Sequence, residues 1–298
     1  MIPTWRRQES LRRALKTIFA CEPAPAETLV HVDVGDTGTG AVLGREFAGA
    51  VTWLQSAEAQ GPGGGRNLLI REARYPFVAS FDDDSWPIDK DYFDIARRLM
   101  EANPKAGVLT GKVILPGQKL EQRRQGSSRL CGSFEAGACV IRRTAFLQTS
   151  GFVPLRRAYG MEEADIALQL LDAKWTILRT AALRVFHDSC LGHHASRDIN
   201  AAHITNTALL AFLRYPVYFW PFGACQTMNR VFYALRAKRY RGIIKGLKDI
   251  PRTVAAHRAS RKPVKGETIC HSRRLAQTAG LGPVSAPLLP SATDRKSG

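Results

Sequence analysis

Acidic residues are almost missing from the last third of this 298-residue chain. Residues 201–298 carry 17 lysines and arginines against 3 aspartates and glutamates, whereas residues 1–200 carry 26 against 23. The formal net charge of +17 therefore arises mainly in the C-terminal third. Such a basic surface predicts a partner with negative charge, and it is separate in sequence from any acidic site in the first 200 residues.

Other patterns are missing as well. The six cysteines form no CxxC pair and show no cysteine–histidine spacing typical of zinc sites, so we expect reduced thiols, as in a cytoplasmic protein. The N-terminal residues lack the apolar core of a signal peptide, and no run of about 18 uncharged apolar residues occurs. The sequence therefore predicts neither secretion through a signal peptide nor a clear membrane span.

Helical and strand periodicities alternate along the first 200 residues. Leu11, Ala14, Leu15 and Ile18 recur at helical spacing and predict a helix over 9–20. Further helices are predicted at 41–48, 67–74, 87–103 and 162–173, and strands at 28–33, 51–55, 75–81, 108–115, 136–142, 176–180 and 183–187. This order predicts an α/β fold with helices on both faces of a sheet.

The character of the chain changes near residue 200, which predicts three regions. Residues 1–200 would form the α/β domain, 201–265 a basic amphipathic helical extension, and 266–298 a disordered tail containing proline, serine and glycine. Between 230 and 265 Asp249 is the only acidic residue among 12 basic ones. Peripheral attachment to an anionic membrane is the favoured interpretation; a packed subdomain with a solvated basic face and nucleic-acid binding are the alternatives.

Three consecutive carboxylates, Asp82, Asp83 and Asp84, follow the apolar run 75–81 and precede Pro87. Ligands bind beyond the carboxyl ends of strands in open α/β sheets, and hard divalent ions prefer oxygen ligands. The segment therefore predicts a site for a metal ion and a diphosphate. An acidic turn that caps the next helix is the alternative.

A glycine-rich segment, 61–67, stands just before the predicted helix at 67–74. Glycines at such a position allow backbone amides to approach a phosphate, and Arg66 would add a guanidinium. A flexible loop without a ligand is the alternative interpretation.

Acidic residues also begin the predicted helix at 162–173, where Glu162, Glu163 and Asp165 stand in its first turn. Acidic side chains are common there because they interact favourably with the helix dipole, but one of them could also act as a general base. His187 ends a short predicted strand and is either structural or a further metal ligand.

The order of these segments resembles the GT-A glycosyltransferases of family 2, which use nucleotide sugars and are mostly inverting. The resemblance covers residues 3 to about 216. It rests on the opening strand end 3–7, the turn 32–35, the segment 64–67, the motif 82–84, the segment 151–165 and the histidine at 187. It implies a Rossmann-like three-layer α/β/α sandwich with a mixed, mostly parallel sheet.

The resemblance also implies a donor site. Asp33 would contact the base or ribose of the nucleotide, Arg66 the base or diphosphate, and Asp82 the ribose and the metal. Pro3 and Asp83 would complete the donor site. Val34 and Gly38 stand at positions that are often acidic in relatives, so the identity of the nucleotide is not predicted.

The remaining implied roles concern the metal and the base. Asp84 would be the chief ligand of Mg²⁺ or Mn²⁺, with Asp82 and His187 beside it. Glu163 would be the catalytic base, supported by Glu162 and Asp165. The loop 117–132 would exclude water from the reaction.

The sequence thus predicts a glycosyltransferase that moves a sugar from a nucleoside-diphosphate sugar to an acceptor hydroxyl by metal-assisted inverting displacement. The acceptor would be a saccharide or a lipid-linked molecule in cell-surface polysaccharide or glycolipid synthesis, at the inner face of the cell membrane. A basic nucleic-acid-binding protein, a nucleotidyltransferase with the same carboxylates, and an inactive sugar-binding relative are the alternatives.

Overall fold

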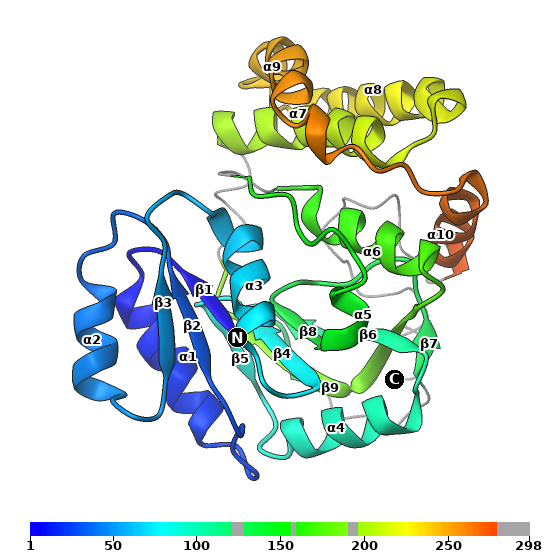
Figure 1. Cartoon of the computed structure of the whole chain (residues 1–298). Coiled ribbons are helices and arrows are strands. Elements are labelled where there is room, and N and C mark those ends of the chain that lie inside the picture. Colours follow the sequence, from blue (N-terminus) through cyan, green and yellow to red (C-terminus); the bar gives the residue numbers. More distant parts are fainter. Residues whose placement is uncertain (121–127, 156–158, 190–195, 279–298) are drawn as a thin grey trace. The chain divides into compact units, whose positions relative to one another are not determined.

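The computed structural model describes residues 1–120, 128–155, 159–189 and 196–278 (Figure 1). The chain divides into two compact units. The N-terminal unit comprises Met1–Arg129, Phe134–Arg156 and Trp175–Cys190, and the helical unit comprises Leu130–Ser133, Arg157–Lys174 and Leu191–Gly298.

Strands and helices alternate in the N-terminal unit, as the sequence predicts. In chain order they are β1 (Ile2–Thr4), α1 (Gln8–Phe19), β2 (Leu29–Val32), α2 (Thr39–Glu46), β3 (Thr52–Gln55), α3 (Gly61–Glu72), β4 (Phe77–Phe81), β5 (Ser85–Pro87), α4 (Tyr92–Ala102), β6 (Ala106–Ile114), β8 (Ala138–Arg142), α5 (Arg143–Phe146) and β9 (Thr176–His187). The two-residue strand β7 (Arg129–Leu130) lies at the boundary of the units.

The sheet of this unit is mixed. β1, β2 and β3 pair in parallel in that order, and the main path of the remaining strands runs β4-β8-β6-β9-β5. The N–H of Phe81 in β4 donates to the carbonyl of Met1 at 3.1 Å, which joins the two sets of strands. β6 and β9 are parallel, whereas the other three pairs of the main path are antiparallel. A mixed α/β sheet is confirmed, but parallel pairs do not predominate.

Alternation along β2 separates the two faces of the sheet. Val30 and Val32 are buried in an apolar core with side chains of α1, α2 and α4. His31 points to the opposite face, where a Cβ on Gly65 of α3 would lie only 2.4 Å from its Nδ1 atom. Helices therefore cover both faces of the sheet, as predicted.

The helix α3 begins at Gly61, earlier than the predicted start at Asn67. The carboxylate of Asp33 accepts hydrogen bonds from the backbone N–H groups of Gln60 (3.0 Å) and Gly61 (2.9 Å), which have no partner within a helix. The glycine-rich segment is thus the first part of a helix, so the flexible loop predicted as the alternative is wrong, whereas the approach of a phosphate to its backbone amides stays a prediction.

Two other boundaries differ from the prediction because strands pair across the chain. Residues 85–87 form β5 against the end of β9, so α4 begins at Tyr92 rather than at Pro87. The segments 176–180 and 183–187 belong to one strand, β9, which pairs with β6 through register shifts.

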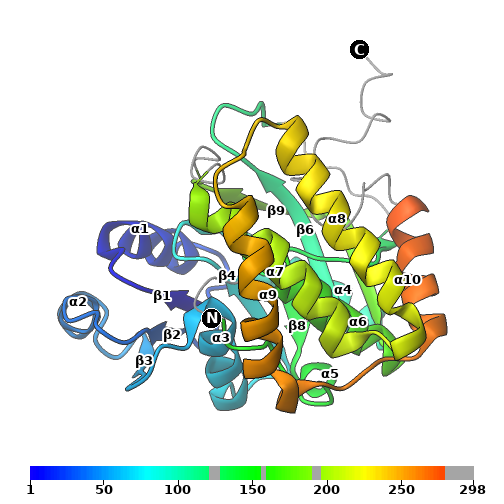
Figure 2. The same ribbon diagram turned by 90° about the horizontal axis from the view of Figure 1, so that it is seen from above.

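The helical unit contains α6 (Glu162–Asp172), α7 (Arg197–Arg214), the 3₁₀ helix η2 (Val217–Phe219), α8 (Trp220–Arg236), α9 (Ile243–Ala256), the 3₁₀ helix η3 (Arg258–Ser260) and α10 (Gly266–Thr278). Both α8 and α9 pack against α7 (Figures 1 and 2). Among the described residues, no helix combines the length and the apolar character that a membrane crossing requires.

The tail predicted to be disordered from residue 266 instead begins with the helix α10. Ile269 of α10 is buried, and the hydroxyl of Thr268 donates to Asp172 of α6 at 2.7 Å. These contacts order the segment, so the prediction is wrong for 266–278. Residues 279–298, and residues 121–127 of the predicted water-excluding loop, lie outside the described residues.

Candidate active site

The three aspartates form a fixed turn between β4 and β5. The N–H of Asp82 donates to the hydroxyl oxygen of Ser85 at 2.8 Å, and the N–H of Ser85 donates to the carbonyl of Asp82 at 3.0 Å. The hydroxyl of Ser85 in turn donates to the carbonyl of Gly137 at 2.7 Å. The turn is therefore attached to the sheet, which fixes the directions of the carboxylates that follow β4.

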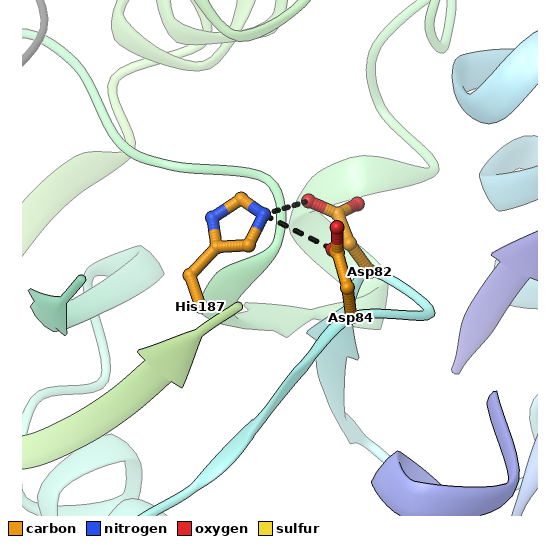
Figure 3. A group of neighbouring side chains, drawn as sticks. All are labelled: Asp82, Asp84 and His187. Atoms are coloured by element: carbon orange, nitrogen blue, oxygen red, sulfur yellow. Dashed lines mark ion pairs between the residues drawn. The ribbon is translucent and has the colours of Figure 1, made fainter. Parts of the chain in front are cut away.

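Antiparallel pairing brings His187 to this turn, because His187 at the end of β9 stands opposite Ser85 of β5. Its Nε2 atom lies 3.1 Å from Oδ1 of Asp84 and 3.9 Å from Oδ2 of Asp82 (Figure 3). One ligand atom from each of the three residues lies within 4.8 Å of the others. Two carboxylates and an imidazole so arranged are a donor set that suits Mn²⁺ or another divalent ion.

Each aspartate of the turn also has a positively charged partner. The guanidinium of Arg7 donates to Oδ1 of Asp83 and to Oδ2 of Asp84, both at 2.8 Å. Arg66 is buried, donates to the hydroxyl of Ser80 at 3.1 Å and forms an ion pair with Asp82. The arginines offset the repulsion within the acidic turn, and Arg66 holds Asp82 in place.

The electrostatic environment shifts the pKa values of Asp83 and Asp84 in opposite directions. Burial raises the pKa of Asp83 to about 7 despite the charge of Arg7 and a hydrogen bond from Thr4. Burial acts in the same direction on Asp84, but His187 and Arg7 outweigh it and hold its pKa below the usual value. Asp84 is thus charged at neutral pH, as a metal ligand must be.

For His187, burial lowers the pKa, but the hydrogen bond with Asp84 and the charges of Asp82 and Asp84 outweigh burial. Its pKa therefore lies above the usual histidine value. The side chain is drawn electrostatically toward the same two carboxylates that would share a metal ion with it.

The other residues predicted for the donor site lie in β1 and after β2. Pro3 of β1 stands opposite His31 of β2. Asp33 follows β2, and its two carboxylate oxygens accept the N–H groups of Val34, Gln60 and Gly61. Asp33 therefore fixes the beginning of α3; its contact with a nucleotide stays a prediction.

The acidic residues predicted to be catalytic lie at the beginning of α6, in the helical unit. Glu162 and Asp165 are buried, whereas Glu163 is partly exposed. Asp165 forms an ion pair with Arg214 of α7. Of the three, Glu163 is the one whose side chain has access to solvent, and the other two are buried.

Sequence reasoning gave no role to Arg7 or Arg214. Both stand far in sequence from their partners, Asp83 and Asp165. The position of Arg7 within the segment 3–7 is a signal, because that segment already marks the end of β1 beside the acidic turn.

Comparisons with solved structures show the fold. The chain is similar to the mannosyltransferase PcManGT from Pyrobaculum calidifontis, solved with GDP-Man and Mn²⁺, with a TM-score of 0.57, 15% identity and coverage of 92% of this chain and 82% of that chain. It is also similar to residues 1–349 of TarS from S. aureus, solved with UDP-GlcNAc, with a TM-score of 0.51, 12% identity and coverage of 85% and 90%.

A third similar structure is GalNAc-T7 with UDP, GalNAc and Mn²⁺, at a TM-score of 0.57 and 10% identity; the match covers 86% of this chain and 56% of that chain. These likenesses confirm the GT-A fold. No curated protein matches the sequence. The model of glycosyl transferase family 2 matches residues 1–160, and the chain therefore belongs to this family of transferases.

Proposed function

We propose that the protein transfers a sugar from a nucleoside-diphosphate sugar to an acceptor hydroxyl by inverting displacement. The observation that carries the proposal is the grouping of Asp82, Asp84 and His187 at the ends of β4 and β9. In a GT-A fold this edge of the sheet is where a donor diphosphate and its metal ion would bind.

We assign these three side chains as the ligands of the metal ion. The ion itself would be Mn²⁺ or Mg²⁺. The imidazole ligand favours Mn²⁺, because Mg²⁺ prefers oxygen ligands alone. When bound, the ion would neutralise the charge that develops on the leaving diphosphate. The similar structures of PcManGT and GalNAc-T7 were solved with Mn²⁺, which supports the assignment.

The donor nucleotide is assigned to the region of Pro3, Asp33, Arg66 and Asp83. GDP-Man, UDP-GlcNAc and UDP in the three similar structures support a nucleotide sugar as the donor. Arg66 and Arg7 already pair with the acidic turn, so their positive charge lies where the negative diphosphate would approach.

Glu163 is assigned as the general base. Its carboxylate would take the proton of the acceptor hydroxyl as the acceptor oxygen attacks the anomeric carbon and the bond from that carbon to the diphosphate oxygen breaks. Its partial exposure supports this role, whereas the buried Glu162 and Asp165 support the position of α6.

We further propose that the acceptor is a saccharide or lipid-linked molecule of cell-surface polysaccharide or glycolipid synthesis, reached at the inner face of the cell membrane. The excess of basic residues in 201–298 supports a location beside an anionic surface.

The test measures release of nucleoside diphosphate from a panel of UDP- and GDP-sugars with Mn²⁺, with Mg²⁺ and with EDTA. We expect metal-dependent release, retained donor binding but lost transfer in Glu163→Gln, and native transfer in the control Glu267→Gln, an exposed acid of α10. NMR of the product should show an inverted anomeric centre.

Other outcomes contradict the proposal. Transfer at the native rate by Glu163→Gln would remove this residue from the reaction. Release of pyrophosphate would indicate a nucleotidyltransferase, and salt-sensitive binding of DNA without turnover of any donor would indicate a nucleic-acid-binding protein.

A further inference from the structure

The helix α8 has its small residues inside and several of its large apolar residues outside. Gly223, Thr227, Val231 and Ala234 recur at helical spacing and are buried. A Cβ on Gly223 would lie 2.4 Å from the Cβ of Ala211, so close packing against α7 requires these small side chains. The packing of α8 against α7 therefore does not use the large apolar residues of α8.

A second stripe of α8 consists of Met228, Phe232 and Leu235, at i, i+4 and i+7. These side chains are 46%, 55% and 41% exposed. Soluble proteins seldom leave such a row of large apolar side chains in water, and a contiguous patch of this kind marks a contact with a partner or a membrane.

The helix α9 continues this pattern. Its Gly246 is buried against Ala201 of α7, whereas Ile244 is 70% exposed and Leu247 is 39% exposed. Figure 2 shows α8 and α9 on either side of α7. We call the exposed apolar side chains of these two helices the α8–α9 face; they are Met228, Phe232, Leu235, Ile244 and Leu247.

Positive charge lies beside the α9 part of the α8–α9 face. Beside Ile244 lies a concavity of about 480 Å³, lined by Arg197, Lys245 and Lys248 together with Tyr240 and a single acid, Asp249. Asp249 pairs with Lys245, which leaves a net positive charge around the concavity. Basic side chains next to exposed apolar ones are complementary to a phospholipid surface, which carries phosphate groups outside and has an apolar interior.

We propose that the helical unit binds an anionic lipid bilayer through the α8–α9 face. The apolar side chains would enter the boundary between headgroups and acyl chains, while Arg197, Lys245 and Lys248 contact lipid phosphates. The absence of a spanning helix among the described residues is compatible with attachment at the surface. This inference does not rest on the transfer reaction and is tested without a sugar donor.

The experiment is sedimentation of the full chain with vesicles of phosphatidylcholine alone or with phosphatidylglycerol added. We expect binding only to the vesicles that contain phosphatidylglycerol, and weaker binding at high salt. The triple variant Met228→Glu, Phe232→Glu and Leu235→Glu should lose binding by at least about tenfold, because it removes apolar contacts and adds negative charge.

The matched controls change exposed residues of the N-terminal unit. Leu147→Glu, at a side chain that is 45% exposed, should bind vesicles like the native protein, whereas Lys245→Glu with Lys248→Glu should bind less than the control Lys105→Glu. Circular dichroism of each variant checks that it folds.

Three results would overturn the proposal. The first is native binding to vesicles by a folded triple variant. The second is a concentration-dependent dimer that the triple variant abolishes, which would make the α8–α9 face a contact between copies. The third is equal binding to vesicles with and without phosphatidylglycerol.

Discussion

The guanidinium of Arg214 in α7 and the carboxylate of Asp165 in α6 form a buried ion pair. Both Nε and Nη2 of Arg214 donate to this carboxylate, the second at 3.2 Å, and neither side chain is more than 1% exposed. Nη1 of Arg214 also donates to the carbonyl of Lys262 at 3.3 Å. One arginine thus ties α6, α7 and the segment before α10 together.

Replacing Asp165 by Asn should destabilise the protein by about 3–5 kcal/mol, because the charge of Arg214 would stay buried without a counter-ion. Urea unfolding followed by circular dichroism measures the loss. In the double variant Asp165→Leu with Arg214→Met most of the lost stability should return, because apolar residues can replace a buried pair. A cost below about 1 kcal/mol for Asp165→Asn would contradict this account of the pair.

The pair between Arg7 and Asp83 should show energetic coupling. Asp83 is buried and receives hydrogen bonds from Arg7 and from the hydroxyl of Thr4, both at 2.8 Å. A double-mutant cycle of Arg7→Ala and Asp83→Asn should give a coupling energy of about 1 kcal/mol or more. The measurement is the free energy of unfolding of the four proteins.

An exposed pair serves as the control for this cycle. Arg97 and Glu101 of α4 lie one turn apart, 2.8 Å from each other, and are both more than half exposed. The same cycle there should give a coupling of about 0.5 kcal/mol or less. Equal coupling in both pairs would show that burial of Asp83 adds nothing.

Local sequence patterns predicted the candidate metal site. They could not predict contacts between residues that are far apart in the sequence. Asp82, Asp84 and His187 end two strands that are visible from apolar runs, and the order of motifs indicated that they belong together. The early beginning of α3 depends on hydrogen bonds to Asp33, far away in sequence. The residues of α3 themselves give no indication that Asp33 accepts hydrogen bonds at the beginning of this helix.

The same reason explains why the sequence did not predict that Arg7 and Arg214 would pair with Asp83 and Asp165. Arg7 and Arg214 each pair with a carboxylate that lies on another element, far away in the sequence. The tail beyond residue 266 has a polar composition, yet burial of Ile269 and the contact with Asp172 order its first part. Tertiary packing there overrides composition.

Mn²⁺ should stabilise the folded protein through Asp84. A ligand present at about 100 times its Kd stabilises the folded state by about 2.7 kcal/mol. Thermal unfolding with and without Mn²⁺ should therefore show a rise in Tm that Asp84→Ala abolishes. Glu101→Ala, which removes an exposed acid of α4, should keep the rise. An equal rise in Asp84→Ala would place the ion elsewhere.

Gly65→Ala should destabilise the protein by about 1–3 kcal/mol through overpacking. The added Cβ would lie 2.4 Å from Nδ1 of His31, a fully buried side chain whose Nε2 lies 2.5 Å from the hydroxyl of Ser56. Gly44→Ala is the matched control, because a Cβ at Gly44 in α2 meets nothing within 4 Å. The free energy of unfolding of Gly44→Ala should be about 0.5–1 kcal/mol higher than that of the native protein. Similar free energies for the two variants would contradict the close approach of α3 to β2.

The last prediction concerns Asp36, a buried carboxylate that orders the turn before α2. It accepts hydrogen bonds from the N–H groups of Arg6 (2.6 Å), Gly38 (3.2 Å) and Thr39 (3.0 Å) and from the hydroxyl of Thr39 (2.7 Å). Burial raises the pKa of Asp36, but these hydrogen bonds outweigh burial and hold it below the usual value. The stability that Asp36 contributes is therefore present above its unfolded pKa of about 3.9 and is lost as the pH falls through the folded pKa.

We expect Asp36→Asn to be less stable than the native protein at pH 6, and the difference in free energy of unfolding to shrink below about pH 4. Urea unfolding between pH 6 and pH 3 measures this difference, with Glu58→Gln, an exposed residue, as the control. A difference that stays constant down to pH 3 would show that the charge of Asp36 does not hold the turn.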